Sequence, residues 1–512
     1  MPKSYWWAYL VVFIASGCTL ILEIVAGRIV APVVGVSLYT WTSVIGVVLA
    51  GISLGNYTGG VVADRWVARR TLGIILALGG VSSLAVLPLT RIMTDYHYPD
   101  GTSLVTKIVA MTAVIFFPPA FIISMTTPVV IKLSLKDLSQ TGGVVGRIYA
   151  ISTCGSILST FLTGFVLIAF FGTRTIVLWV GIVLLLLALT FGGLLTGDRA
   201  GAAAGTAVSA LLAVVVVAAS FNLHAFESGC DRETNYYCIR VVPTEQDGRP
   251  VEQFILDHLI HSFSDISDPT YLHYGYEKVY AEMMDYTAKP KPDFSLLQLG
   301  AGGYTTPRFV EATYPQAKDE VIEIDPGVTQ MAYERMGLSP RARVITINLD
   351  ARLGLQDLPG NQKFDLILGD AFNDLSVPYH LTTREFDRQI QSRLTPTGFY
   401  LANIIDKMQG GRFIPSVVRT LETVFPNVYV MSEFDSFSTP SQNTYVVAAS
   451  MTPLDEPRLR AAHGQGPSGS SITKIMPQTD MQDWLQHADS VLLTDDYVPA
   501  DNLLAPLFLE RN

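Results

Sequence analysis

The stretch LLQLGAGGYTTPRF, residues 296–309, is typical of a buried apolar strand that runs into a glycine-rich turn and then a helix. Glycines at such a turn let the backbone bend sharply and approach a ligand closely. The segment DEVIEID, residues 319–325, places Glu323 about twenty residues further on, where an acid binds ribose hydroxyls. Because the glycines do not follow G-x-G-x-x-G, the pattern favours a nucleoside over a dinucleotide.

Strand-like segments alternate with helical ones through the second half of the chain: FSLLQL, DEVIEI, RVITIN, FDLILGD and GFYLANII. This alternation predicts an α/β doubly wound, Rossmann-like domain of the methyltransferase type over residues 289–512, with its ligand beyond the carboxyl ends of the strands. Residues 223–288 precede it and contain TNYYCIRVV, the turn QDGR and VEQFILD, which together predict a β-hairpin followed by a helical, aromatic segment.

Further acids follow the later strands of this predicted sheet. Asp350 follows the third strand, and Asp370 and Asp374 follow the fourth. Any one of them could simply cap a helix. Together with Glu323 they would line one cleft with negative charge, which suits a cationic substrate and a positively charged nucleoside.

The first half of the chain has a different composition. Hydrophobic residues make up 49% of the sequence, and up to Asn222 there are 12 Lys and Arg against 6 Asp and Glu. The rest of the chain carries the acidic excess behind the net charge of −10. We therefore expect a helical membrane domain over residues 1–222, embedded in a lipid bilayer, and an acidic soluble part that does not bind nucleic acid.

Apolar runs long enough to cross a bilayer predict about seven membrane spans. They begin near Trp6, Tyr39, Thr71, Leu104, Val144, Thr175 and Ala202. The first run is too long for a cleavable signal peptide and contains Glu23 and Arg28. These two residues either form a functional polar site among the helices or pair with each other and with nearby backbone.

Lysines and arginines in the short loops indicate an orientation. The larger set follows the second, fourth and sixth spans and consists of Arg65, Arg69, Arg70, Lys132, Lys136, Arg147 and Arg199. The smaller set lies on the opposite side and consists of Arg91, Lys107 and Arg174. The positive-inside rule places the N-terminus in the cytoplasm of a bacterial inner-membrane protein. Seven spans would then place the soluble part outside.

The four cysteines give no zinc signature and hence no predicted metal site. Cys230 and Cys238 lie eight residues apart at the start of the soluble part. They either form a disulfide, which suits an oxidising compartment, or remain reduced thiols.

Four motifs carry a resemblance to a known family: residues 300–308, EID at 323–325, DA at 350–351 and GDAFNDLSVP at 369–378. Together they resemble the spermidine synthases, or polyamine aminopropyltransferases, over about residues 230–510. The N-terminal half is similar to membrane regions fused to such domains in bacteria.

The resemblance implies transfer of an aminopropyl group from decarboxylated S-adenosylmethionine, a co-substrate, to putrescine or a related amine, with no permanently bound cofactor. The products would be spermidine and methylthioadenosine, and family members commonly form homodimers. By position the resemblance assigns the following roles: Asp370 the catalytic base, Asp374 and Pro378 the amine site, Glu323 the ribose, Asp350 and Ala351 the adenine, and Gly300 and Gly302 the turn beneath the nucleoside.

The chain departs from the family pattern near the amine and the sulfonium. Gly303 replaces an acid of the turn, Tyr237 replaces a glutamine, and LDG-x-x-Q has become LDHLIH, in which His261 could contact substrate or carry a proton. Two alternatives therefore stay open. One is a methyltransferase that uses S-adenosylmethionine, and the other is a membrane sensor or transporter that binds polyamine or nucleoside without turnover.

Overall fold

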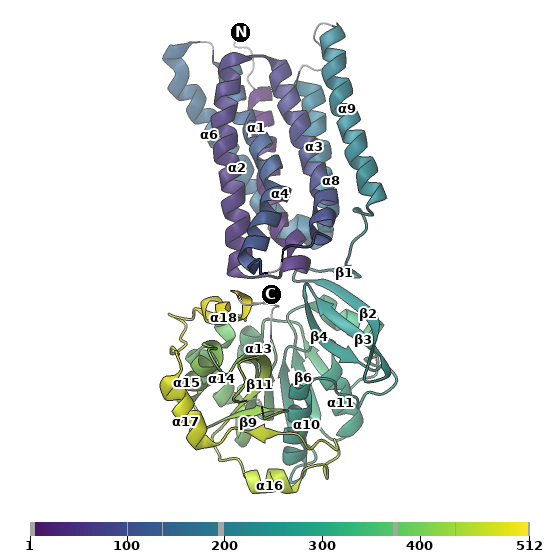
Figure 1. The fold of residues 1–512 in the computed structure, drawn as a ribbon, viewed down its shortest axis with the longest axis vertical. Helices are drawn as coiled ribbons and strands as arrows, with labels where there is room; N and C mark the ends of the chain where they lie inside the picture. Colours follow the sequence, from purple (N-terminus) through teal and green to yellow (C-terminus); the bar gives the residue numbers. More distant parts are fainter. Residues whose placement is uncertain are drawn as a thin grey trace. The chain divides into compact units, whose positions relative to one another are not determined.

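The computed structural model describes residues 6–99, 101–135, 137–192, 199–371, 377–435 and 437–509. The chain forms two compact units, Met1–Gly229 and Cys230–Arg511. The first consists of helices and the second of strands and helices (Figure 1). The division falls a few residues after the predicted boundary at residue 222.

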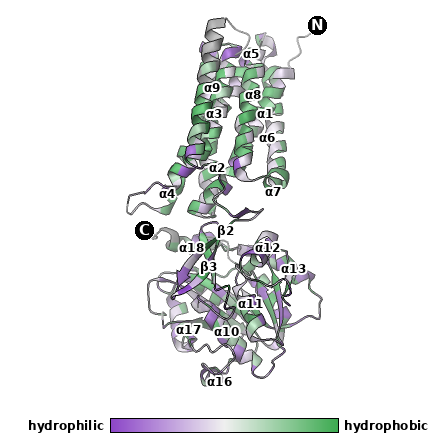
Figure 2. Ribbon diagram, turned by 90° about the vertical axis from the view of Figure 1, so that its right-hand side faces the viewer, coloured by the Kyte–Doolittle hydropathy of each residue, from purple (hydrophilic) through white to green (hydrophobic). Residues whose placement is uncertain are grey.

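Long apolar helices make up the first unit, and Figure 2 shows hydrophobic residues along most of their length. Their bounds are α1 (Trp6–Val34), α2 (Leu38–Arg65), α3 (Arg69–Thr94), α4 (Leu104–Ser124), α5 (Thr126–Ser134), α6 (Thr141–Leu162), α7 (Ile168–Phe170), α8 (Thr173–Phe191) and α9 (Arg199–Asn222).

Six segments of the described chain are long and apolar enough to cross a membrane, so the prediction of seven spans was wrong. The seventh predicted span, near Ala202, lies in α9. Within α9, the residues searched for apolar spans give the shorter stretch Ala210–Asn222, which is not among the six segments.

Glycines set the close packing of this unit. Gly51, Gly55 and Gly59 recur along α2, and a Cβ atom at any of them would clash with α4 or with Met125 just beyond it. Gly155 of α6 lies in the same way against the backbone of Phe13 in α1. Such small residues let membrane helices approach each other through their backbones.

The second unit begins with a four-stranded antiparallel sheet. Its strands are β1 (Arg232–Glu233), β2 (Cys238–Gln246), β3 (Arg249–Leu256) and β4 (Leu259–Ser264), in that order. Asp247 and Gly248 join β2 to β3 with φ of 52° and 73°. Two central residues with positive φ are what a tight hairpin turn requires, so the predicted hairpin is present.

The larger sheet has eight strands in the order β12-β10-β11-β9-β8-β5-β6-β7. Their bounds are β5 (Ser295–Leu299), β6 (Lys318–Ile322), β7 (Ile345–Ile347), β8 (Phe364–Gly369), β9 (Leu394–Lys407), β10 (Asn427–Ser432), β11 (Gln442–Ser450) and β12 (Lys474–Ile475). Strands β5 to β9 pair in parallel, whereas β11 pairs antiparallel to both β9 and β10. This confirms the predicted Rossmann-like α/β class, and the antiparallel edge adds to it.

Helices cover both faces of this sheet: α10 (Gly275–Ala288), α11 (Thr305–Thr313), α12 (Pro326–Glu334), α13 (Ala351–Asp357), α14 (Arg384–Arg393), α15 (Phe413–Glu422), α16 (Glu456–Ala461), α17 (Gln478–His487) and α18 (Ala500–Leu509). Leu401 of β9 packs in the core beneath α10, while its neighbour Tyr400 faces a small cavity beside α14 and α15. The chain runs from β5 to β6 and β7 on one side, then to β8 and β9 on the other. The strand order therefore reverses between β5 and β8, which is where such sheets bind ligands.

Candidate active site

The glycine turn follows β5 at this reversal point. Gly300 has a φ of +85°, and a Cβ atom there would lie 2.5 Å from the carbonyl oxygen of Asp370. Its amide donates to the carbonyl oxygen of Ile322 at 2.9 Å, which joins the turn to the end of β6. Position 300 therefore needs glycine for both its conformation and its close approach to β8.

Glu323 lies directly after β6 and faces the turn. Its carboxylate accepts hydrogen bonds from the amides of Ala301 at 3.1 Å and Asp325 at 2.9 Å. Burial raises the pKa of Glu323 to about 7 in spite of these bonds. The carboxylate is thus held in a fixed direction at the floor of the turn.

Asp350 caps the N-terminus of α13. Its Oδ1 accepts from the amides of Arg352 at 3.0 Å and Leu353 at 3.1 Å, and its Oδ2 lies 2.7 Å from Nε2 of His380. The capping role that we considered for any single acid is therefore real, yet the second oxygen remains directed at His380. Nothing in the sequence indicated His380, because the loop that carries it has no periodic pattern.

A first cavity of about 220 Å³ opens above the glycine turn. All the predicted site residues within the described chain line it: Gly300, Gly302, Glu323, Asp350, Ala351, Asp370, Pro378 and His261. Asp374 lies outside the described residues. Tyr236, Tyr237 and His380 are among the other residues that line it, and of these three only Tyr237 was singled out from the sequence.

Asp370 follows β8 directly and is half-buried. Nδ2 of Asn403, on the neighbouring strand β9, donates to its Oδ1 at 2.7 Å. Burial raises the pKa of this carboxyl, while the hydrogen bonds from Asn403 and Tyr276 act in the opposite direction. A carboxylate with a raised pKa is a stronger base than an exposed one.

A second cavity of about 430 Å³ adjoins the first. Asp370, His261, Ala301 and Gly302 line both cavities, whereas Tyr274, Tyr276, Glu277, Asn403 and Gln442 are among the residues that line only the second. The Asp370 residue therefore borders two adjoining cavities. Such an arrangement can bring two small molecules to one base.

Glu277 is a buried acid in the wall of the second cavity. Its Oε2 accepts a hydrogen bond from the Tyr274 amide at 3.0 Å, which caps α10. Burial raises the pKa of Glu277 to about 8. The group is therefore largely protonated at neutral pH and contributes little negative charge.

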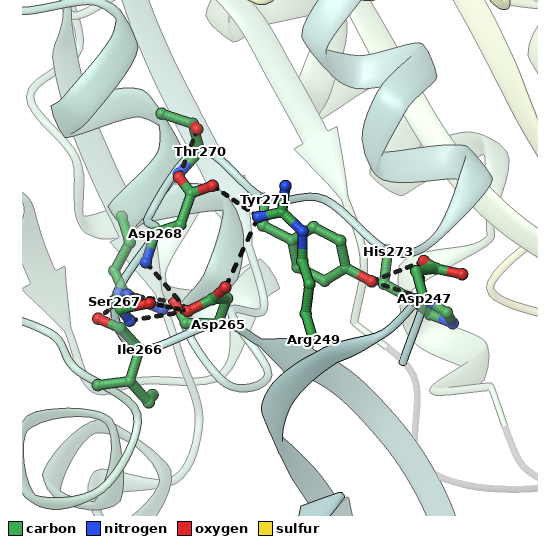
Figure 3. A network of polar contacts seen from close by, with 10 residues as sticks. Asp247, Arg249, Asp265, Ile266, Ser267, Asp268, Thr270, Tyr271 and His273 are labelled. Carbon is green, nitrogen blue, oxygen red and sulfur yellow. Dashed lines mark hydrogen bonds and ion pairs between the residues drawn. The ribbon is translucent and has the colours of Figure 1, made fainter. Parts of the chain in front are cut away.

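A polar network fixes the segment that leads into α10 (Figure 3). NH1 of Arg249 lies 2.9 Å from Oδ2 of Asp268, and its guanidinium lies over the Tyr271 ring at 5.3 Å. The Tyr271 hydroxyl in turn donates to Asp247 at 2.8 Å. The hairpin turn thus holds the loop that brings Tyr274 to the second cavity.

A disulfide joins Cys230 to Cys238, which answers the question that the sequence left open. The loop that it closes carries Tyr236 and Tyr237, which line the first cavity. Oγ1 of Thr234, in the same loop, donates to Asp325 at 2.5 Å. Among the described residues, no three His, Cys, Asp or Glu side chains gather where they could hold a metal ion.

Comparison with known proteins agrees with this geometry. No protein-family model matches the chain. A polyamine aminopropyltransferase of Vibrio vulnificus (strain CMCP6) is 31% identical over 227 residues, which is 42% of this chain and 71% of that protein. Polyamine aminopropyltransferase 2 of Streptomyces coelicolor is 25% identical over 415 residues, covering 76% of this chain and 71% of the relative. Since Cys230–Arg511 is little more than half of the chain, the second match must extend into the helical unit.

Two further similarities are to a methyltransferase and to a solved structure. A human eEF1A lysine and N-terminal methyltransferase is 28% identical over 146 residues, 27% of this chain and 21% of that protein. The solved structure of a probable spermidine synthase from Corynebacterium glutamicum ATCC 13032 has a TM-score of 0.44 and 19% identity, over 50% of this chain and 93% of that one.

The strand order, the glycine turn and the acids at the strand ends define a Rossmann-like transferase of the methyltransferase type. Within that class, the identity and coverage of the Vibrio protein place this chain in the polyamine aminopropyltransferase family. The chain is a transferase of that type. Transfer in this family uses decarboxylated S-adenosylmethionine as co-substrate.

Proposed function

We propose that this protein is a membrane-anchored aminopropyltransferase that acts on putrescine or a related amine. The first cavity would bind the nucleoside of decarboxylated S-adenosylmethionine, with Glu323 on the ribose, Asp350 and Ala351 at the adenine, and Gly300 and Gly302 beneath it. The acceptor amine would enter the second cavity, on the other side of Asp370. The resemblance assigns amine binding to Pro378, which lines the first cavity, and to Asp374, which lies outside the described residues. The observation that carries the proposal is that Asp370 borders both cavities.

The chemistry requires a base at this junction. A primary amine with a pKa near 10 is almost wholly protonated at neutral pH and cannot act as a nucleophile. Asp370 would take one proton from the ammonium group, and the amine would attack the propyl carbon bonded to sulfur. A carbon–nitrogen bond forms, the carbon–sulfur bond breaks, and its electron pair neutralises the sulfonium to give methylthioadenosine. Asp370 acts as the base, and binding in adjacent cavities supplies the alignment.

A mass-resolved assay of the purified full-length protein with putrescine and decarboxylated S-adenosylmethionine tests this proposal. We expect spermidine and methylthioadenosine to form together. Asp370→Asn should lower the rate by roughly 10²–10⁴-fold, the usual contribution of a positioned base. If methylthioadenosine binds but no product forms, the protein would be a binding protein or would use another reaction.

One observation favours methyl transfer as the second candidate. Gly303 places no acid beside the expected position of the donor's aminopropyl tail, so a carboxylated tail would not be repelled there. Methyl transfer would require S-adenosylmethionine to bind more tightly than its decarboxylated form. Competition between these two nucleosides against methylthioadenosine separates the two reactions.

We also propose that the six apolar segments cross a bacterial inner membrane. The arginines and lysines after the second and fourth segments place the N-terminus in the cytoplasm. An even number of crossings would return the soluble unit to the cytoplasm, where the nucleoside donor is made. A reporter enzyme fused after Asn512 tests this topology, because activity outside the cell would require α9 to be a seventh crossing.

A further inference from the structure

Three buried polar atoms near Asp370 have no hydrogen-bond partner within the part of the chain that the structure describes. They are Nε2 of His261, Oγ of Ser262 and Oδ1 of Asn403. Ser262 is 3% exposed and Asn403 is 4% exposed. Because buried polar groups are normally paired, three unpaired atoms on residues that line one cavity indicate a missing partner.

All three residues line the second cavity, and they come from separate places in the chain. His261 and Ser262 lie on β4, whereas Asn403 lies on β9 next to Asp370. The amide nitrogen of Asn403 already donates to Asp370. This bond fixes which end of the amide faces away from Asp370, so the unpaired end is an oxygen, which only accepts.

The glycine turn explains how Ser262 reaches this place. A Cβ atom at Gly303 would overlap Oγ of Ser262 and would lie 3.2 Å from Cβ of Phe254. The Ser262 hydroxyl therefore occupies the space that a side chain at position 303 would need.

The chemistry of these atoms selects a ligand group. The Asn403 oxygen, the Ser262 hydroxyl and an imidazole nitrogen that carries no proton can each accept a hydrogen bond. Burial lowers the pKa of His261 to about 4, which keeps its ring neutral. A primary ammonium group has three N–H donors and no acceptor. Three acceptors on residues that line the same cavity as Asp370 match those donors in number and kind.

We propose that Ser262, His261 and Asn403 bind a primary ammonium group of the substrates through neutral acceptors. This inference rests on the proposed function, in which the aminopropyl tail of the donor and the acceptor amine both carry such a group. Ser262 is then a specificity-determining residue of the second cavity.

Titration calorimetry on the full-length protein in lipid nanodiscs tests the inference with three ligands. Decarboxylated S-adenosylmethionine and putrescine carry a primary ammonium, and methylthioadenosine does not. Ser262→Ala should weaken one of the ammonium ligands by roughly tenfold, the loss of one hydrogen bond to a charged group. Methylthioadenosine should bind the variant as it binds the unmodified protein. Weaker binding of the donor assigns the group to the donor tail, and weaker binding of putrescine assigns it to the acceptor.

Ser264→Ala provides the matched control. Ser264 is a buried serine on the same strand, but its hydroxyl lies 2.7 Å from Oγ1 of Thr305 and is already paired. This variant should bind all three ligands normally. Unchanged binding of both ammonium ligands to Ser262→Ala would overturn the inference.

Two further outcomes keep the inference separate from the proposed function. If methylthioadenosine fails to bind the unmodified protein while Ser262→Ala still weakens an ammonium ligand, the nucleoside site fails and the inference stands. If Ser262→Ala does not fold, His261→Phe removes a second acceptor and should give the same selective loss. Equal binding of all three ligands by His261→Phe and the unmodified protein would then overturn the inference.

Discussion

Asn403 Nδ2 donates a 2.7 Å hydrogen bond to Oδ1 of Asp370, and these residues lie on adjacent parallel strands, β9 and just after β8. The bond holds the carboxylate where the two cavities meet. A hydrogen bond to the ionised form of a carboxyl lowers its pKa and so opposes the effect of burial. Asn403 therefore sets how easily Asp370 ionises.

Asn403→Leu tests this role. Loss of the amide should raise the pKa of Asp370 further, because burial would then be less opposed. The acid limb of the pH profile of kcat/KM should move to higher pH, so activity should fall most at low pH and recover as pH rises. A uniform loss at every pH, with the limb unmoved, would contradict this role.

Glu277 should make stability depend on pH. Burial raises its pKa from 4.5 to about 8, so the folded state binds this proton more tightly than the unfolded state. The resulting stability is fully present below the ordinary carboxyl pKa and is lost as pH rises through about 8. Glu277→Gln keeps an oxygen to accept from Tyr274 but cannot ionise, and it should reduce the fall in the thermal midpoint between pH 6 and pH 9. Glu245→Gln, an exposed change on β2, should leave that fall as it is.

Gly300→Ala should strain the glycine turn and displace the catalytic base Asp370. Alanine at a φ of +85° costs about 1–3 kcal/mol in backbone strain, and its Cβ would press on the carbonyl of Asp370. We expect lower stability and at least a tenfold loss of turnover, measured by thermal unfolding and by the product assay. Gly360→Ala is the matched control, because a Cβ atom there meets nothing within 4 Å. Equal behaviour of the two variants would contradict the requirement for glycine at position 300.

The sequence predicted the parts of this site that depend on local pattern. Gly300, Glu323 and Asp370 follow strands directly, Asp350 lies in the loop after β7, and parallel strands bring such positions to one edge. Asn403 and Ser262 escaped prediction because their roles depend on which strand lies beside β8 and on how β4 packs against the turn. His380 and Tyr236 lie in loops without periodic signals. The antiparallel edge of β10 to β12 escaped for the same reason as Asn403, since strand pairing is a long-range property.

The helical unit shows where composition alone was insufficient. Hydropathy located the apolar runs, and six of the seven became segments long enough to cross. The run near Ala202 was counted because it is rich in alanine and valine. Among the described residues it contributes only the stretch Ala210–Asn222 and is not one of the six segments. An even and an odd number of crossings would place the second unit on opposite sides of a membrane, so this one run decides the expected topology.

The Cys230–Cys238 disulfide leads to the last prediction, because it closes the loop that carries Tyr236 and Tyr237 into the first cavity. Reduction would leave Thr234 and its bond to Asp325 as one of the remaining ties of this loop. Each tyrosine would then have to be ordered on binding, at about 0.5–1.5 kcal/mol per side chain. For the two tyrosines together this cost is about 1–3 kcal/mol, so the affinity for methylthioadenosine should fall by roughly five- to 150-fold on adding a thiol reductant. Disulfides in a reducing compartment are usually transient and redox-sensing. A second unit that lies in the cytoplasm would therefore change its nucleoside affinity with oxidation and reduction of this disulfide.

The controls are cysteine variants. The Cys230→Ser/Cys238→Ser double variant should show the weaker affinity both with and without the reductant, whereas the affinity of Cys18→Ser and Cys154→Ser should still fall when the reductant is added. If calorimetry under reducing conditions gives the same affinity for methylthioadenosine, Tyr236 and Tyr237 keep their positions in the first cavity without the disulfide, and the prediction is wrong.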